Sequence, residues 1–407
     1  MNFSVANLNQ PACDPRLWLL GQAVTFLNHG SFGACPQRVL EFQYDLRARL
    51  ERQPVQFLVR ELEPLLDNAR AALAQFVVAD ADDLVFAPNT TSGVNAVLRS
   101  LTFLPGDELL VTNHEYAACR NALNYVAERS GARVVVVNIP FPFSSADEII
   151  APILAAVTSR TRLALLDHVS SQTGLVMPIG RLVGELASRG VDTLVDGAHA
   201  PGMVPLNIKK IGATYYTGNC HKWLCAPKGA AFLCVQPSRQ KLIRPLVISN
   251  GASSARTDRS KFQIEFAWTG TGEPSAYLCV PEVLKFMASL LPGGWPEIMT
   301  RNRALAIAAR KILCASLKIS EPCPEEFIGS LAAMPLPDAP PEALPRQPFN
   351  EYPLQDWLRG QHGIEVPIMA WPAPPKRLLR ISAQLYNSLP QYERLAAALA
   401  KTDLTKL

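Results

Sequence analysis

The chain has 407 residues, of which 48% are hydrophobic and 18% are charged, and its formal net charge is +4. This composition is typical of a globular protein with enough core for more than one domain. The small positive charge is not gathered into a Lys/Arg block, which argues against a nucleic-acid partner. No apolar run reaches about 18 residues, which argues against a membrane span. The first twenty residues do not have the pattern of a signal peptide, so we expect a cytoplasmic protein.

Seven strand-like runs follow one another along the first 235 residues, with turns or helical patterns between them. Most of these runs are continuously apolar, as expected for strands that are covered on both faces. Helical patterns fall between them at 63–77, 92–101 and 179–189. The alternation predicts an α/β fold with a mostly parallel, seven-stranded sheet and helices on both faces. The runs are 83–89, 107–113, 132–139, 162–169, 192–199, 213–219 and 229–235.

The pattern changes after about residue 280. Helices are predicted at 280–291 and 301–317, a strand at 377–387 and a closing helix at 389–401. The segment 320–348 contains eight prolines, which predicts an irregular connection because proline disrupts helices and central strands. We therefore expect a smaller α+β C-terminal domain. The predicted boundaries are an N-terminal segment packing on the small domain (1–22), a large domain (23–279) and the small domain (280–407).

Nine cysteines are scattered along the chain without a CxxC pair. Their spacings fit no zinc pattern, so we expect no metal site. Cysteines of this kind are small buried apolar residues in a reducing compartment.

Polar residues follow several of the runs, where ligands bind in parallel α/β sheets. Asp196 ends one apolar run, and Lys222, preceded by His221, follows the next. Either residue alone fits an ordinary strand-end aspartate or a surface lysine. Together they fit pyridoxal 5'-phosphate (PLP) chemistry, in which a lysine forms a Schiff base and a carboxylate keeps the pyridine nitrogen protonated. Thr90 and Thr91 open a helix after a strand, which suits a phosphate or a simple helix cap.

Five strings resemble the class V aminotransferases, and in particular the isopenicillin N epimerase-like branch, which is related to the cysteine desulfurases. The resemblance runs from Asn28 to Asn387. It implies the aspartate aminotransferase-like fold of PLP-dependent transferases, PLP as cofactor, and a homodimer with a shared active site. The strings are NHGSFG (28–33), NHEYAACRN (113–121), HKWLCAPKG (221–229), AWTGTGEPSA (267–276) and LRISAQLYNS (379–388).

The resemblance also implies which residues hold the cofactor. Tyr116 takes the aromatic position that stacks on the pyridine ring, with His114 as the competitor for that role. His199 matches a residue that hydrogen-bonds the ring hydroxyl, and Ser171 stands where many relatives have asparagine. The residues that match phosphate contacts are Thr90, Thr91, Asn219, His221 and, from the second subunit, Thr271.

The expected substrate is a small-molecule amino acid. Arg380 matches the family arginine that binds an α-carboxylate, for which a guanidinium supplies two parallel donors. Asn28, His29 and Gly30 resemble a segment that touches substrate, although a simple turn explains them nearly as well.

The resemblance implies that Lys222 removes the Cα proton as general base. Epimerisation then needs a second acid, for which Tyr116 or a water is the candidate. The alternatives are a class V aminotransferase, a C–S lyase and, outside catalysis, a silent PLP-fold binding protein. The segment 362–380 has no cysteine, which argues against a persulfide mechanism.

Overall fold

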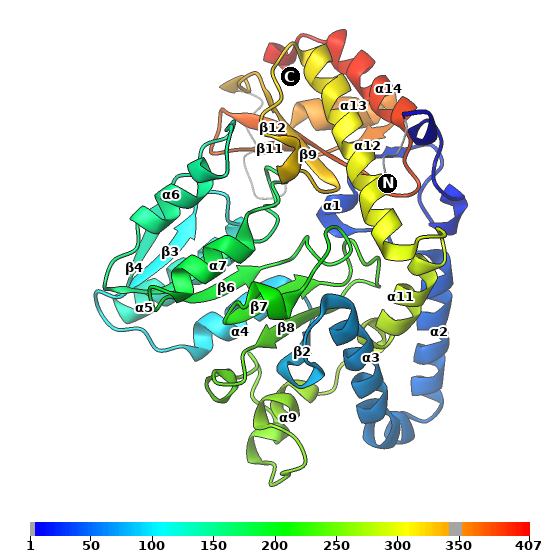
Figure 1. Cartoon of the computed structure of the whole chain (residues 1–407). Coiled ribbons are helices and arrows are strands. Elements are labelled where there is room, and N and C mark those ends of the chain that lie inside the picture. The colour runs from blue at the N-terminus through cyan, green and yellow to red at the C-terminus, as the bar shows by residue number, and fades with distance from the viewer. Residues whose placement is uncertain (1–4, 342–351) are drawn as a thin grey trace.

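A seven-stranded sheet forms the centre of the computed structural model, which describes residues 5–341 and 352–407 (Figure 1). The strand order is β2-β8-β7-β6-β5-β3-β4, and all neighbours are parallel except the two pairs that β8 makes. The predicted mostly parallel sheet is confirmed. Its strands are β2 (Leu84–Ala87), β3 (Glu108–Thr112), β4 (Arg133–Val137), β5 (Thr161–Asp167), β6 (Asp192–Asp196), β7 (Tyr215–Asn219) and β8 (Ala231–Val235).

Helices cover both faces of this sheet, because alternate strand residues point to opposite sides. In β3, Leu109 and Val111 pack with the apolar residues of α4 (Thr90–Ser100) and α5 (Ala117–Ser130). Leu110 points to the opposite face and lies in a second core cluster, which includes apolar residues of α7 (Ile179–Ala187). The other helices around the sheet are α2 (Gln37–Arg52), α3 (Leu62–Val77), α6 (Asp147–Ala155), α8 (Ile208–Ile211), α9 (Lys261–Ala267), α10 (Ser275–Leu278) and α11 (Val280–Ala288).

The C-terminal part adds a small antiparallel sheet in the order β11-β12-β9, at the opposite end of the molecule from α9 (Figure 1). The long helix α12 (Gly294–Leu317) begins seven residues before its predicted start, because Trp295 and Ile298 extend its buried apolar spacing. The remaining elements are β9 (Leu331–Leu336), α13 (Pro353–His362), β10 (Ile364–Glu365), β11 (Ile368–Ala370), β12 (Arg377–Ser382) and α14 (Leu389–Ala400).

The prediction of an irregular 320–348 segment is wrong over β9, a six-residue strand that includes Pro335. The strand forms because β9 lies at the edge of its sheet, where a proline removes no central ladder bond. Residues 342–348 of that segment lie outside the described residues.

The N-terminal segment contacts the C-terminal part. The Ala12 N–H donates to the Leu385 carbonyl at 2.8 Å, and β1 (Thr25–Phe26) pairs with β10. The exact domain boundaries stay a prediction. In the described residues no helix is long and apolar enough to cross a membrane. All nine cysteines lie in the described part of the chain and are free, and all but Cys13 are buried.

Candidate active site

The ends of three neighbouring strands bring the predicted residues to one edge of the central sheet. Asp167, Asp196 and Asn219 are the last residues of β5, β6 and β7, and Asp167 lies directly beside Asp196 in the strand register. Lys222 follows β7 by three residues. The site therefore forms where the carboxyl ends of parallel strands meet, as expected from the sequence.

The N-terminus of α4 offers a site for an anion. The Asn219 side-chain oxygen accepts from the Thr90 N–H at 2.9 Å, and Asn89 caps the helix by accepting from the Ser92 N–H at 2.8 Å. The buried Thr90 hydroxyl has no hydrogen-bond partner among residues 5–341 and 352–407. An unpartnered hydroxyl at the start of an eleven-residue helix fits a phosphate group.

The other expected phosphate contacts are placed around this helix start. Thr91 lies in its first turn and is half-buried. His221 donates through Nδ1 to the Ala230 carbonyl at 2.9 Å, so this hydrogen bond does not use its Nε2. Thr271 lies on an exposed loop between α9 and α10, so its expected contact with a second subunit stays a prediction.

Lys222 faces a histidine whose tautomer is fixed by its neighbour. The Trp223 indole N–H, which can only donate, points at His199 Nδ1 at 3.2 Å. His199 therefore carries its proton on Nε2, which lies 3.0 Å from Lys222 Nζ. An ammonium group has no lone pair to accept this N–H, so the contact requires a neutral amine. Burial lowers the pKa of Lys222 to about 8 and holds that of His199 well below its usual range.

The segment 28–30, which was expected to touch substrate, packs against the backbone of Lys222. His29 is fully buried, with Nδ1 2.8 Å from the Tyr386 hydroxyl and Nε2 3.1 Å from the Lys222 carbonyl. A Cβ on Gly30 would lie 2.7 Å from a Leu331 methyl. Both ring nitrogens of His29 are engaged and Gly30 is needed for packing, so the geometry does not favour their expected contact with substrate.

Gly33 has a comparable packing role beneath the lysine. Its φ of 71° is a conformation that side chains disfavour, and a Cβ there would lie 2.2 Å from the His221 carbonyl oxygen. The glycine therefore lets α1 (His29–Phe32) end directly against the backbone of Lys222.

Arg380, on β12, is a buried cation held by neutral oxygens. Its Nη2 donates to the Ser31 hydroxyl at 2.9 Å, and its Nη1 donates to the Ser171 carbonyl. Ser31 in turn donates to the Asn28 side-chain oxygen at 2.5 Å, so Asn28 acts on Arg380 through Ser31. Ser171 thus contacts Arg380 mainly through its backbone carbonyl, and the contact of its side chain with the ring hydroxyl stays a prediction.

Within the described residues no carboxylate forms an ion pair with Arg380, and its buried Nε has no partner. Burial lowers its pKa to about 10, a value at which the guanidinium stays charged. A buried charge without a counter-ion is costly. The arrangement fits the carboxylate of a ligand, which would supply both the missing charge and an acceptor for Nε.

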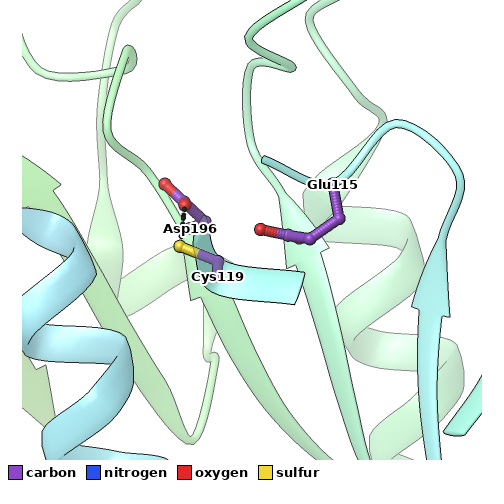
Figure 2. Close-up of side chains that lie close together, drawn as sticks. All are labelled: Glu115, Cys119 and Asp196. Carbon is purple, nitrogen blue, oxygen red and sulfur yellow. Dashed lines mark hydrogen bonds between the residues drawn. The ribbon is translucent and has the colours of Figure 1, made fainter. Parts of the chain in front are cut away.

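Asp196 accepts two hydrogen bonds. Its Oδ1 accepts from the Ala198 N–H at 2.8 Å and its Oδ2 from the Cys119 thiol at 3.2 Å. Glu115 approaches the same place, with one ligand atom each of Glu115, Cys119 and Asp196 lying within 4.8 Å of one another (Figure 2). Burial raises the pKa of Asp196 and, further, that of the Cys119 thiol. Glu115, Cys119 and Asp196 thus form one buried polar cluster, which the cysteine spacing did not indicate.

The two candidate ring-stacking residues have different surroundings. His114 is fully buried, with Nδ1 2.8 Å from the Thr173 hydroxyl and Nε2 3.2 Å from the Ile139 carbonyl. Tyr116 immediately precedes α5 and is 38% exposed. Tyr116 is therefore the better placed of the two to meet a ligand, and its stacking role stays a prediction.

Several residues of the site were not identified from the sequence. Glu115 and Cys119 lie inside the string 113–121, but Glu115 precedes the helix that carries Cys119, so their spacing did not indicate that they meet. Asp167 lies in the predicted strand 162–169. The next predicted strand, 192–199, contains Asp196, but Asp167 was not identified as a site residue. The full set comprises Glu115, Cys119, Asp167 and Trp223.

Comparisons with known proteins agree with this geometry. The family model described as Aminotransferase class-V matches residues 35–323. An isopenicillin N epimerase of Amycolatopsis lactamdurans is 36% identical over 394 residues, covering 93% of this chain and 95% of that protein. A probable chloroplastic L-cysteine desulfhydrase of Arabidopsis thaliana is 33% identical over 397 residues, covering 92% and 82%.

Solved structures show the same architecture. A mutant of C-DES with glycine covalently linked to its PLP cofactor has a TM-score of 0.78 at 21% identity, covering 95% of this chain and 99% of that one. The cysteine desulfurase CsdA from Escherichia coli has a TM-score of 0.76 at 20% identity, with 98% of both chains covered. At these identities the likeness shows the fold.

Proposed function

Because the chain belongs to the class V aminotransferase family, we propose that it acts at Cα of an α-amino acid, as an epimerase of the isopenicillin N epimerase type. The family, the fold and PLP as cofactor, all predicted from the sequence, are confirmed. The protein is a PLP-dependent enzyme. The reaction and its substrate are the proposal.

The residues present fit this cofactor. When bound, PLP supplies an electron sink for the bond broken at Cα. In this proposal Asp196 would pair with the pyridine nitrogen, Lys222 would make the covalent link and His199 would hydrogen-bond the ring hydroxyl. The unpartnered Thr90 hydroxyl, together with Thr91, Asn219 and His221, would hold the phosphate.

The observation that carries the proposal is the combination of Lys222 and Arg380 at one site. Arg380 is a buried cation with no counter-ion in the described residues, so it would bind and orient the substrate carboxylate. Burial lowers the pKa of Lys222 to about 8, so a large share of Lys222 is the neutral amine at pH 8, which is the form that takes a proton from Cα. The positive charge of Arg380 also lowers the pKa of Lys222, which supports their acting on one molecule.

Epimerisation needs a proton donor on the opposite side of Cα from Lys222. Burial raises the pKa of the Tyr116 phenol, so the phenol keeps its proton at neutral pH. The positive charge of Arg380 lowers the pKa of Tyr116, which supports the proximity of Tyr116 to the site where Arg380 would bind the substrate carboxylate. We propose Tyr116 as the second acid.

A C–S lyase is the second candidate, because a curated relative of nearly equal identity is named as an L-cysteine desulfhydrase. Loss of a thiol from Cβ uses the same Lys222 base and the same Arg380 contact, but it does not need Tyr116 as an acid. The segment 362–380 contains no cysteine, so a persulfide on that segment is not part of this proposal.

The experiment incubates the PLP-loaded protein with single amino acids, including L-cysteine, in D₂O. Mass spectrometry and chiral chromatography follow deuterium at Cα and its configuration, while sulfide and keto acids are assayed in parallel. Deuterium with inversion supports the epimerase. Sulfide and pyruvate from L-cysteine without inversion support the lyase. A keto acid formed with stoichiometric amino transfer would instead indicate an aminotransferase, and no exchange with any substrate would contradict the proposal.

We also propose that the chain forms a homodimer in which Thr271 reaches the phosphate site of the second subunit. Large exposed apolar side chains support an interface, among them Phe32 on α1 and Tyr44 on α2. Sedimentation of the purified protein tests this directly, since a monomer at micromolar concentration would contradict it.

A further inference from the structure

Three carboxyl groups meet beneath the candidate cofactor site, although only one of them was expected there. Asp167 and Asp196 are side by side at the ends of β5 and β6. Glu115 arrives from the loop between β3 and α5, and its side chain points toward Asp196 and Cys119 (Figure 2). Glu115 is 6% exposed, and each aspartate is 3% exposed.

Three buried carboxylates so close together cannot all be ionised, because like charges in a buried site repel strongly. The charged groups that act on Glu115 are Asp167, Asp196 and a single cation, Arg120. Lys222 acts on the two aspartates. The positive charge on this side of the sheet is therefore too small to balance three carboxylates.

Hydrogen-bond donors decide where the remaining negative charge lies. Asp196 accepts from the Ala198 N–H and from the Cys119 thiol. Within the described part of the chain, neither oxygen of Glu115 has a hydrogen-bond partner, and Asp167 Oδ2 has none. Donors stabilise the ionised form of a carboxyl group, so ionisation is easiest at Asp196 and hardest at Glu115.

We propose that Glu115 is a positioning residue that carries a proton, so that the cluster Glu115–Asp167–Asp196 keeps one negative charge, located on Asp196. Burial, with the two aspartates adding to it, raises the pKa of Glu115 well above its usual range. Glu115 thereby fills the space behind Asp196 without adding a second charge. The role toward the pyridine nitrogen rests on the proposed function, whereas the protonation concerns the chain itself.

The first test is infrared spectroscopy of the cofactor-free protein at neutral pH. The wild type should show a protonated-carboxyl band that shifts in D₂O, and the band should weaken in Glu115→Gln. The matched control, Glu128→Gln, changes an exposed residue of α5 and should leave the band unchanged. An identical band in the wild type and Glu115→Gln would overturn the proposal.

The second test uses the pH dependence of the melting temperature of the same cofactor-free proteins. A Glu115 that stays protonated when folded, but ionises when unfolded, makes the folded state bind more protons. The stability of the wild type then falls as the pH rises above the usual pKa of a glutamate side chain, whereas Glu115→Gln has no such loss. The melting temperature of Glu115→Gln relative to wild type should therefore rise between about pH 6 and about pH 8. A constant difference would overturn the proposal.

The third test measures PLP affinity and the pH titration of the bound cofactor's absorption. Glutamine resembles a neutral carboxyl group, so Glu115→Gln should match wild type, whereas Glu115→Ala should bind PLP roughly tenfold more weakly because it leaves a gap behind Asp196. Equal losses in both variants would show that the ionised form is needed. Absence of turnover would contradict the proposed function and leave the infrared result unaffected.

Discussion

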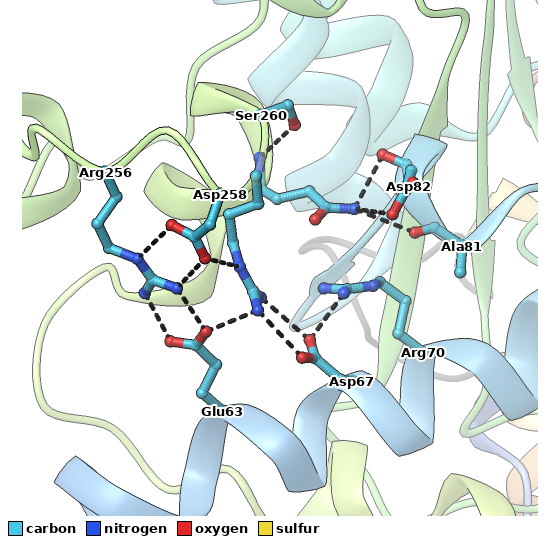
Figure 3. A network of polar contacts seen from close by, with 10 residues as sticks. Glu63, Asp67, Arg70, Ala81, Asp82, Arg256, Asp258 and Ser260 are labelled. Atoms are coloured by element: carbon cyan, nitrogen blue, oxygen red, sulfur yellow. Dashed lines mark hydrogen bonds and ion pairs between the residues drawn. The ribbon is translucent and has the colours of Figure 1, made fainter.

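Two groups of charged side chains in this protein are organised in opposite ways. On the surface, Glu63 and Asp67 of α3 bind Arg256 and Arg259 of the segment before α9, and Arg70 completes the network (Figure 3). Each carboxylate there has an arginine within 3.1 Å, and the Arg256 hydrogen bond lowers the pKa of Glu63. At the candidate active site, the buried Arg380 has no counter-ion among the residues that the structure describes.

The difference separates charges that hold the fold together from charges that wait for a ligand. Balanced exposed pairs fasten one segment to another and are screened by salt. Unbalanced buried charges cost stability in the free protein and gain a partner only when a ligand binds. Variants of the two groups should therefore differ in kind, with losses of function at the site and small losses of stability at the network.

The largest effect is expected from Lys222→Ala. The variant loses both the covalent link and the base, so Cα deuterium exchange should fall by roughly 10²- to 10⁴-fold, the usual contribution of a positioned general base. Borohydride should no longer trap the cofactor. Lys210→Ala, an exposed lysine of α8, is the control and should keep wild-type exchange. Retained exchange in Lys222→Ala would contradict the assignment.

Arg380→Lys keeps the charge but removes the two parallel donors. A hydrogen bond to a charged group contributes about 1.5–3 kcal/mol, so kcat/KM should fall roughly 10- to 150-fold. The loss should come mainly from KM, because the contact is with the substrate carboxylate. Arg181→Lys, an exposed ion-pair residue of α7, is the control. An unchanged KM would show that another group binds the carboxylate.

Trp223→Phe removes the N–H that fixes the His199 tautomer. His199 can then place its lone pair toward Lys222, which would stabilise the ammonium form and move the lysine pKa upward from about 8. The measurement is the pH dependence of Lys222 acylation in the cofactor-free protein, followed by peptide mass spectrometry. The control is Trp357→Phe on α13. A midpoint that stays near 8 would mean that burial alone sets the pKa.

The smallest effect is expected from Arg259→Ala in the surface network. This arginine binds both Glu63 and Asp67, and its loss should lower stability by about 0.5–1 kcal/mol. The melting temperature should fall by about 1–2 °C at low salt, and less at high salt, with kcat and KM unchanged. Arg256→Ala, which is more exposed, should do less. Altered kinetics in Arg259→Ala would contradict the separation between the two groups.

The fold was largely predictable because its signals are local. The strand-like apolar runs and the helical patterns between them require only the residues of each segment, and most of the seven strands lie within their predicted ranges. The strand β9 was missed because its proline is acceptable only at a sheet edge, and edge position depends on the other strands.

The candidate site divides in the same way. Lys222, Asp196, Thr90 and Arg380 stand out from their motifs, because each has a distinctive residue type at the end of a recognisable element. Their partners come from distant parts of the chain: Cys119 lies 77 residues from Asp196, and Ser31 lies 349 residues from Arg380. Sequence spacing does not report such contacts, since they depend on how β12 and α1 pack over the central sheet.

The sequence by itself therefore determined the family, the cofactor and the edge of the sheet where the chemistry takes place. Only the tertiary structure decided which charges are balanced. The packing places the His29 ring against the Lys222 carbonyl and the Ser171 carbonyl against Arg380. It also brings Glu115 close to Asp196. The physical reason is that ionisation depends on burial and on the nearest donors and charges, and both are set by the packing of segments far apart in the chain.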